Sequence, residues 1–290
     1  MRNRQLGIVH AVIIIVLAGL AYASTRAAGS DDGLLHVYVL DVGQGDAIFI
    51  ESPNHTQVLI DGGRPDNRVL EQLAEILPPL DRTIDAVVVT HPHADHIGGL
   101  SAVLSRYDVG AVVEATERYD SSEYRTWERA VDTEGATRVD AIAGTSLDLG
   151  GGVTLSILYP SASAQNIATK KPHSYNVTTL LTYGTTRMLL TGDMEGDAEQ
   201  ALINHALPID VDVLKVGHHG STTSSSTAFL NATSPRVALI SVGARNTYHH
   251  PAPSTLARLE RMGIPYYRTD AHGTVEVISD GATFAVIPEK

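Results

Sequence analysis

Three histidines and one aspartate lie close together in the run His91-Pro92-His93-Ala94-Asp95-His96. Neutral imidazole and carboxylate are ligands that suit Zn²⁺ and Mn²⁺ in proteins. His91 and His93 are two residues apart, so in an extended turn their rings can converge on one ion, while Asp95 and His96 can turn towards a second. A pair of ions roughly 3.5–4 Å apart can activate a bridging hydroxide for hydrolysis. The run therefore predicts a hydrolytic site that holds one or two ions of Zn²⁺ or Mn²⁺.

A two-ion site needs further ligands from distant parts of the chain, and Asp193 is a candidate for one of them. It ends the run Leu190-Thr191-Gly192-Asp193, directly after an expected strand over residues 187–190. A carboxylate at a strand end, after a glycine turn, can bridge two ions. The alternative is that Asp193 caps the helix expected to begin near Glu195.

His218 and His219 follow another expected strand, over residues 211–216. We expect one of the two imidazoles to bind metal and the other to contact substrate, with His219 the favoured ligand. A structural role is the alternative for either histidine. Lys215 and His250 are candidates, with His218, for contacting a phosphate or protonating a leaving group. Asp95 would orient the attacking hydroxide while it binds metal.

Three more aspartates stand near expected strand ends in the first part of the chain. Asp61 closes the strand over residues 57–60, and Asp41 and Asp46 flank a glycine-rich turn. Carboxylates that accept a hydrogen bond from a ligating histidine fix its orientation. We expect these aspartates to lie behind the metal ligands, although Asp61 more often has a purely structural role.

The elements that must position these residues alternate between β-rich and helical stretches. The region over residues 117–145 is charged and sparsely apolar, apart from a short helical piece around Trp127, and is expected to be a surface excursion or lid. The expected strands cover 34–42, 47–50, 57–60, 86–90, 111–115, 153–158, 177–183, 187–190, 211–216 and 236–242. The expected helices cover 68–77, 98–107, 195–206 and 254–262. This order suggests sheets covered by helices, in one domain over 34–290.

The N-terminus has the pattern of a targeting segment. Arg2 and Arg4 precede an uncharged apolar run, which ends in Ala21-Tyr22-Ala23. This is typical of a secretory signal peptide with a small-x-small cleavage site, or of an uncleaved membrane anchor. Residues 1–23 are therefore expected to be the signal peptide or anchor, and 24–33 a tether. The domain is expected outside the cytoplasm, with membrane contact only through the N-terminal segment.

Composition narrows the chemistry further. The 290 residues contain no cysteine, which excludes disulfides, thiolate zinc sites and a cysteine nucleophile. The formal net charge is −12, with a pI near 5.4, which disfavours a protein that holds nucleic acid by overall basicity. Aromatic residues make up only 5%, so extensive stacking platforms for single strands are not expected.

Taken together, the motifs resemble the metallo-β-lactamase fold superfamily, and more narrowly the metallohydrolase domain of ComEC-type competence proteins. The resemblance covers roughly residues 34 to 280. The matching stretches are Leu40-Asp-Val-Gly-Gln-Gly-Asp46, Thr90–Gly99, Leu189-Leu-Thr-Gly-Asp-Met-Glu195, Asp212-Val-Leu-Lys-Val-Gly-His-His-Gly-Ser221 and Thr247-Tyr-His-His-Pro251.

The resemblance implies an α/β fold, a four-layer αββα sandwich, with a dinuclear metal site at one edge and phosphodiester hydrolysis in an extracytoplasmic space. The metal ligands would be His91, His93, Asp95, His96, Asp193 and His219. Many members carry a third histidine ligand between the first motif and the aspartate, where this chain has Asn176. That departure predicts one weaker metal position. His173 lies nearby but is not included in the ligand set.

Three functions compete at this stage. The first is an exported metal-dependent phosphodiesterase, which the motifs favour as a nuclease related to DNA uptake. Its substrate would be DNA, and a separate membrane channel protein is a candidate partner. The second is a cell-envelope phosphodiesterase, such as a phosphorylcholine esterase, which the acidic charge favours mildly. The third is a non-catalytic metal-binding partner of a DNA-uptake channel.

Overall fold

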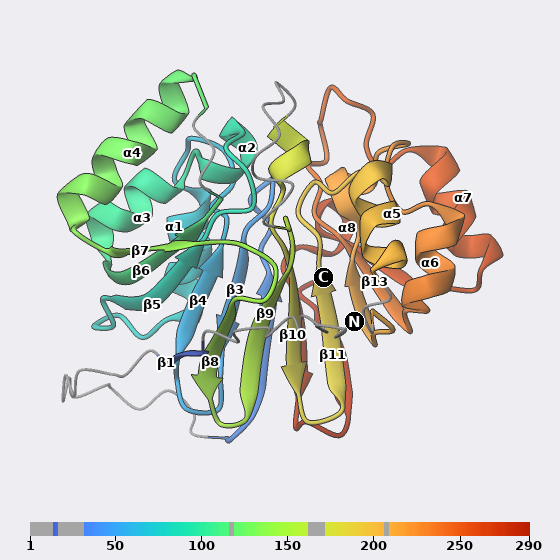
Figure 1. Cartoon of the computed structure of the whole chain (residues 1–290), viewed down its shortest axis with the longest axis horizontal. Coiled ribbons are helices and arrows are strands. Elements are labelled where there is room, and N and C mark those ends of the chain that lie inside the picture. Colours follow the sequence, from blue (N-terminus) through green and yellow to red (C-terminus); the bar gives the residue numbers. More distant parts are fainter. Residues whose placement is uncertain (1–13, 17–31, 116–118, 162–171, 206–208) are drawn as a thin grey trace, which may run out of the picture.

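The computed structural model describes residues 14–16, 32–115, 119–161, 172–205 and 209–290. Two mixed eight-stranded sheets lie at its centre, with helices on both outer sides (Figure 1). This arrangement is the four-layer αββα sandwich, so the fold class predicted from the sequence is confirmed.

The first sheet is built mainly from the first half of the chain and has the strand order β16-β15-β2-β3-β4-β5-β6-β7. β4, β5 and β6 run parallel, so their carboxyl ends lie at one edge of the sheet. Its strands are β2 (Leu35–Val39), β3 (Ile48–Glu51), β4 (Gln57–Ile60), β5 (Thr83–Val88), β6 (Asp108–Glu114), β7 (Thr137–Asp140), β15 (Val275–Ser279) and β16 (Phe284–Pro288).

The second sheet has the order β1-β8-β9-β10-β11-β12-β13-β14, and its strands β11 to β14 are parallel. Its strands are β1 (Ile14–Val16), β8 (Ser146–Gly150), β9 (Val153–Tyr159), β10 (Thr178–Tyr183), β11 (Thr186–Leu190), β12 (Val213–Lys215), β13 (Val237–Ile240) and β14 (Tyr266–Arg268).

The helices divide between the two outer layers (Figure 1). α1, α3 and α4 cover the first sheet and share a core with it, whereas α5, α6 and α7 cover the second. A third core fills the space between the sheets and is lined mainly by aliphatic side chains. The helices are α1 (Arg68–Ile76), α2 (Ala94–Ile97), α3 (Leu100–Arg106), α4 (Ser122–Glu134), α5 (Gly196–Asn204), α6 (Thr227–Thr233), α7 (Pro253–Arg261) and α8 (Thr269–His272), with 3-10 turns η1 (Pro172–Tyr175) and η2 (Gly217–Gly220).

The expectation of a surface excursion or lid over residues 117–145 is wrong for the part that the structure describes. α4 packs against the first sheet, and its Trp127 is fully buried, with the indole N–H donating to Glu114 Oε2 at 2.9 Å. β7 adds a parallel edge strand to β6. The segment was misread because only a narrow stripe of α4 is apolar, and that stripe is enough to bury one face of the helix.

The predicted targeting segment lies almost entirely outside the described residues. The exception is β1, whose backbone pairs in parallel with β8. Among the residues that the structure describes, none of the helices has both the length and the apolar character to cross a membrane. The signal peptide or anchor over 1–23 and the tether over 24–33 stay predictions.

Candidate metal centre

The predicted site residues come together in loops that follow the parallel strands. The run from His91 to His96 follows β5 and continues into α2, Asp193 follows β11, and His218 and His219 follow β12. β5 belongs to the first sheet and β11 and β12 belong to the second, so segments far apart in sequence, from both sheets, supply one cluster of side chains.

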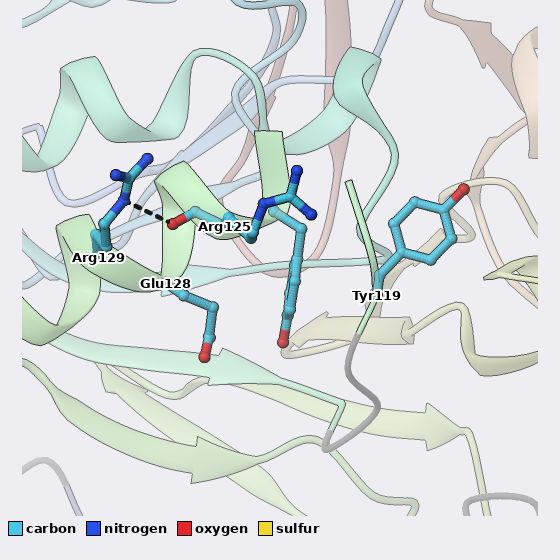
Figure 2. Close-up of a pocket in the computed structure, with 5 residues that line it drawn as sticks. Tyr119, Arg125, Glu128 and Arg129 are labelled. Atoms are coloured by element: carbon cyan, nitrogen blue, oxygen red, sulfur yellow. Dashed lines mark hydrogen bonds between the residues drawn. The ribbon is translucent and has the colours of Figure 1, made fainter. Parts of the chain in front are cut away.

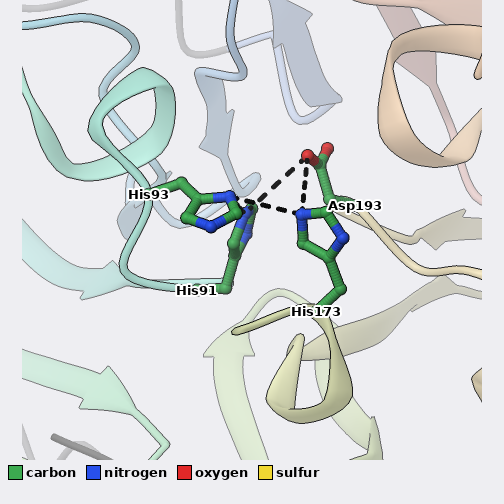
Figure 3. Close-up of side chains that lie close together, drawn as sticks. All are labelled: His91, His93, His173 and Asp193. Carbon is green, nitrogen blue, oxygen red and sulfur yellow. Dashed lines mark hydrogen bonds and ion pairs between the residues drawn. The ribbon is translucent and has the colours of Figure 1, made fainter. Parts of the chain in front are cut away.

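The first group of donor atoms contains three histidines and one oxygen of Asp193 (Figure 3). His93 Nδ1 lies 3.0 Å from His91 Nε2 and 3.2 Å from His173 Nε2. Asp193 Oδ2 lies 3.7 Å from His91 Nε2 and 3.8 Å from His173 Nε2. These four donor atoms come from three separate loops, and the distances between them are those expected of ligands that share a single ion.

The second group gathers around the other oxygen of Asp193. Asp193 Oδ1 lies 3.4 Å from His96 Nε2 and 3.4 Å from His219 Nε2. Asp95 Oδ2 lies 3.5 Å from His219 Nε2. Asp193 therefore presents one oxygen to each group, which is the arrangement of a carboxylate that bridges two ions.

Three atoms of the second group test whether divalent ions fit there. His96 Nε2, His219 Nε2 and Asp193 Oδ1 are all buried and have no hydrogen-bond partner among the described residues. Buried polar atoms without partners are costly, so convergent ones indicate an ion that they would coordinate. Nitrogen and oxygen donors in this mixture fit Zn²⁺ or Mn²⁺.

Hydrogen bonds behind the second group fix its two imidazoles. Asp61 Oδ2 accepts from His96 Nδ1 at 2.7 Å, and both oxygens of Asp61 also accept from Thr90. His219 Nδ1 donates to the Ser241 carbonyl at 3.0 Å and lies 3.3 Å from Asp46 Oδ1. Each Nε2 is thereby left free to point at Asp193. Asp46 and Asp61 thus lie where the sequence placed them, behind the histidines, whereas the Asp41 side chain accepts from the amide of Gly43.

The expectation that Lys215 contacts phosphate is wrong. Its side chain is fully buried, and its ammonium group pairs with Asp46 Oδ2 behind the metal centre. This salt bridge fixes the Asp46 carboxylate, whose other oxygen faces His219, so Lys215 stabilises the metal centre without reaching a substrate. The sequence could not show this, because a lysine at the end of a strand can point either way.

His218 and His219 are adjacent but occupy different surroundings. Both have left-handed backbone angles, with φ of 47° and 52°, a conformation that is costly for residues other than glycine. This turn sends the buried His219 inwards, while His218 stays partly exposed, with Nδ1 3.2 Å from Glu195 Oε1 and Nε2 3.7 Å from Asp193 Oδ2. The His250 ring lies 5.6 Å from that of His218, at the rim of the centre.

Residues 40–244, more than half of the chain, match the family model of the metallo-beta-lactamase superfamily. The chain belongs to this superfamily. The fold of this superfamily binds divalent metal ions, and the two donor groups around Asp193 lie where such ions would sit.

Within the superfamily, the chain is similar to three longer bacterial proteins, one of which is named a competence protein. It is 31% identical to the ComE operon protein 3 of Bacillus subtilis (strain 168) over 87% of this chain and 34% of that protein. It is 32% identical to Recombination protein 2 of Haemophilus influenzae, over 83% and 28%, and 30% identical to the Competence protein ComA of Neisseria gonorrhoeae, over 91% and 35%. The resemblance to ComEC-type proteins is confirmed, and the chain spans about a third of the length of these relatives.

Solved structures agree on the fold alone. Igni18, a metallo hydrolase from Ignicoccus hospitalis, is similar with a TM-score of 0.54 and 15% identity, over 83% of this chain and 98% of that one. CmlA, a diiron beta-hydroxylase from Streptomyces venezuelae, gives 0.54 and 15%, over 88% and 54%.

The first donor group includes a histidine that the predicted ligand set left out. His173, in η1, is the residue that joins His91 and His93. Asn176 is buried; its Oδ1 accepts from the amide of Asp193 at 2.7 Å and its Nδ2 donates to the Thr191 carbonyl at 2.6 Å. Asn176 therefore shapes the turn that presents Asp193, and His173 supplies the third imidazole of the first group.

Gly192 explains why that turn has the sequence Thr-Gly-Asp. Its φ is +52°, and a Cβ atom there would lie 2.4 Å from Asn176 Oδ1. A side chain at this position would push away the amide that holds Asp193.

Glu195, expected from the sequence only as the start of a helix, also lies at the centre. Its Oε1 is 3.5 Å from His173 Nδ1 and 3.2 Å from His218 Nδ1.

The two donor groups differ in electrostatics in the metal-free chain. Burial lowers the pKa of His91 well below its usual value and that of His93 to about 4. Burial also acts to lower the pKa of His219, but Asp193 and Asp46 raise it more, to about 9. For Asp193 burial acts in the opposite sense, yet the charges of His219 and His96 hold the pKa of its carboxyl well below the usual range.

Proposed function

We propose that the chain is a metal-dependent phosphodiesterase that cleaves DNA. The observation that carries this proposal is the Asp193 carboxylate, which gives one oxygen to each of two donor groups. Two divalent ions held side by side are a common arrangement in enzymes that hydrolyse phosphodiesters. The similarity to competence proteins supports DNA as the diester, although it covers only about a third of their length.

The residues would share the work as follows. His91, His93 and His173 would hold one ion, and Asp95, His96 and His219 the other, with Asp193 common to both. Bound ions would supply Lewis-acid polarisation of the phosphoryl oxygens and a source of nucleophile at neutral pH. Asp95, only partly buried and at the open side of the second group, would orient the attacking water.

The partly exposed His218 and His250 are the candidates for the substrate side. His218 Nε2 faces Asp193 Oδ2 at 3.7 Å, and His250 Nδ1 has no hydrogen-bond partner among the described residues. Both imidazoles lie at the rim, where they would contact a phosphate oxygen or deliver a proton to the leaving alkoxide.

A second candidate is hydrolysis of a small envelope diester, such as a phosphorylcholine ester. The formal charge of −12 favours it, since an acidic surface repels a long polyanion. We further propose that the domain acts outside the cytoplasm, delivered by residues 1–23, beside a separate channel protein. Fractionation of cells, with and without those residues, tests the location: the full chain should be found in the envelope or medium, and the truncated chain should stay in the cytoplasm.

The test of function uses the purified full chain loaded with Zn²⁺ or Mn²⁺. Substrates are bis(p-nitrophenyl) phosphate and single- and double-stranded DNA, and the variants are Asp95→Ala and, as a matched control, Asp210→Ala at an exposed position outside the centre. DNA cleavage that only Asp95→Ala abolishes supports the nuclease. Turnover of the small diester without DNA cleavage moves the proposal to an envelope diester, and silence on every substrate with metal bound contradicts both.

A further inference from the structure

A groove of about 750 Å³ opens beside the metal centre. We call it the arginine groove, because Arg64, Arg68 and Arg245 line it, together with Gln44, Asp66 and Tyr248. Three loops form its walls: the turn after β2, the segment that leads into α1, and the loop after β13.

The loops that line the groove pack against the loops of the metal centre. The turn after β2 packs on the metal loop: the amide of Asp46 donates to the Asp95 carbonyl, and a Cβ atom at Gly45 would lie 2.1 Å from that same oxygen. On the other wall, the Tyr248 ring stacks on the His250 ring, with centroids 5.9 Å apart and an interplanar angle of 16°. A ligand in the groove would therefore continue towards the centre past His250.

The charge of the groove opposes that of the whole chain. Three arginines line it against one carboxylate, Asp66, whose Oδ2 lies 3.8 Å from Arg68 Nε. Arg64 and Arg245 are exposed and form no ion pair with any residue that the structure describes. Two unpaired guanidinium groups in a concave site, on a chain of net charge −12, indicate a site for an anion.

Gln44 gives an independent reason to expect a ligand in this groove. Its side chain is only 5% exposed, its Oε1 accepts from the amide of Gly243 at 3.3 Å, and its Nε2 has no partner among the described residues. A buried donor without a partner is costly. An anionic oxygen bound in the groove would satisfy it.

The pocket on the other side of the centre provides a contrast. It has a volume of about 440 Å³ and is lined by Tyr119, Tyr124, Arg125, Glu128 and Arg129 (Figure 2). Arg125 forms a salt bridge with Asp120, and Arg129 Nε donates to the Arg125 carbonyl at 3.1 Å. Tyr119 also contacts the centre, at 5.8 Å from the His93 ring. Here the cations already have partners, so an anion gains less.

We propose that the arginine groove binds the phosphate and the base next to the scissile phosphate of a single-stranded polynucleotide. Arg64 and Arg245 contact the phosphate, and Gln44 donates to one of its oxygens. The base stacks on Tyr248, whose side chain is 64% exposed; an unpaired base is required, because bases in a duplex have no free face. The inference rests on the proposed function and specifies its substrate.

The test compares two double variants of the metal-loaded full chain that remove the same charge. Arg64→Ala with Arg245→Ala alters the arginine groove, and Arg125→Ala with Arg129→Ala alters the opposite pocket. The groove variant should raise KM for a single-stranded oligonucleotide about tenfold or more and lower the salt slope of binding by about 0.7, the value for one phosphate contact on a single strand. Its turnover of bis(p-nitrophenyl) phosphate, which has no neighbouring phosphate, should stay within about twofold of wild type. The matched pair should leave both substrates unchanged.

Equal losses on the two substrates, or equal losses in the two double variants, overturn the inference. Fluorescence anisotropy with a labelled oligonucleotide and metal-depleted protein separates this outcome from failure of the nuclease proposal. If the wild type binds the oligonucleotide, the groove variant binds it more weakly, and the metal-loaded wild type does not cleave it, the nuclease proposal is contradicted and the groove proposal is supported. Absence of binding by wild type overturns the groove.

Tyr248 is tested by two substitutions of different character. Tyr248→Phe keeps the ring and should bind the oligonucleotide as wild type does, whereas Tyr248→Ala should weaken binding about tenfold. A loss in both variants would assign the effect to the hydroxyl and contradict stacking.

Discussion

The two donor groups that share Asp193 differ in what holds them in place. In the second group, His96 and His219 are buried and each Nδ1 donates to a fixed acceptor, Asp61 or the Ser241 carbonyl. In the first, His93 and His173 are partly exposed and contact mainly other imidazoles. The chain therefore has one metal position supported by buried carboxylates and one in which His91 is buried but the other two imidazoles are partly exposed.

This difference suggests separate tasks for the two positions. Ligands whose outer nitrogens are fixed hold an ion tightly and keep its geometry. Ligands on partly exposed loops adjust and exchange more easily. We expect the supported position to be filled first, and the exposed one to load last and to depend more on the concentration of free metal.

The largest effect is expected from Asp193→Ala, because among the described residues this carboxylate alone offers a donor atom to both groups. The variant should lose both ions, and kcat/KM should fall about a thousandfold, since bound metal supplies several kcal/mol of transition-state stabilisation. Metal content by mass spectrometry and turnover of a diester measure it, with Asp210→Ala as the control. Retention of one full ion would show that the groups are independent.

His173→Ala should affect the exposed position alone. With one of three imidazoles gone, the first ion should be lost on dialysis while the second stays, leaving about one ion per chain. His205→Ala, a histidine exposed at the end of α5, is the matched control and should keep both ions. If His173→Ala retains the full metal content, the first group does not use this histidine.

Asp61→Asn tests the supported position alone, because Asp61 accepts a hydrogen bond from His96. The amide nearly preserves the volume but weakens the acceptor for His96 Nδ1, so affinity at the supported position should fall about 10–100-fold. Competition with a chelator measures the two affinities separately. A change confined to the first ion would contradict the division of the site.

The smallest effect is a difference in proton release. Because the pKa of His219 is raised to about 9, the metal-free chain holds that proton at pH 7, and filling the supported position should release about one proton or more. His93, with a pKa of about 4, is already neutral, so it releases none. Affinity at the supported position should therefore rise with pH up to about 9, whereas His91 and His93 add no such dependence at the exposed position.

Calorimetric titration of metal in two buffers with different ionisation enthalpies counts those protons. Equal release in both binding steps would mean that the two positions have the same electrostatics, against the contrast described above.

Local motifs could be predicted from the sequence, and contacts between distant segments could not. The spacing of residues in the run from His91 to His96 and in the turn before Asp193 is enough to predict metal ligands there. His173 was noted but left out of the predicted ligand set, because only the short turn η1 brings it beside His93. The role of Lys215 was predicted wrongly, because its direction depends on Asp46, far away in the sequence.

The fold followed a similar division. Helix α1 was predicted within one residue of its observed end, since its apolar stripe and the Pro78-Pro79 stop are local signals. The charged region around Trp127 was misread, although Tyr124, Trp127 and Val131 are spaced for one helix face. Whether a narrow stripe is buried depends on the sheet that it meets, and that sheet is assembled from the rest of the chain.

The shared carboxylate is tested most directly by electron paramagnetic resonance of the full chain loaded with Mn²⁺. Two ions joined through Asp193 should give an exchange-coupled multiline spectrum, which His173→Ala should convert to the six-line signal of an isolated ion. A six-line signal from fully loaded wild type would contradict a bridged pair, and with it the two-ion site proposed for hydrolysis.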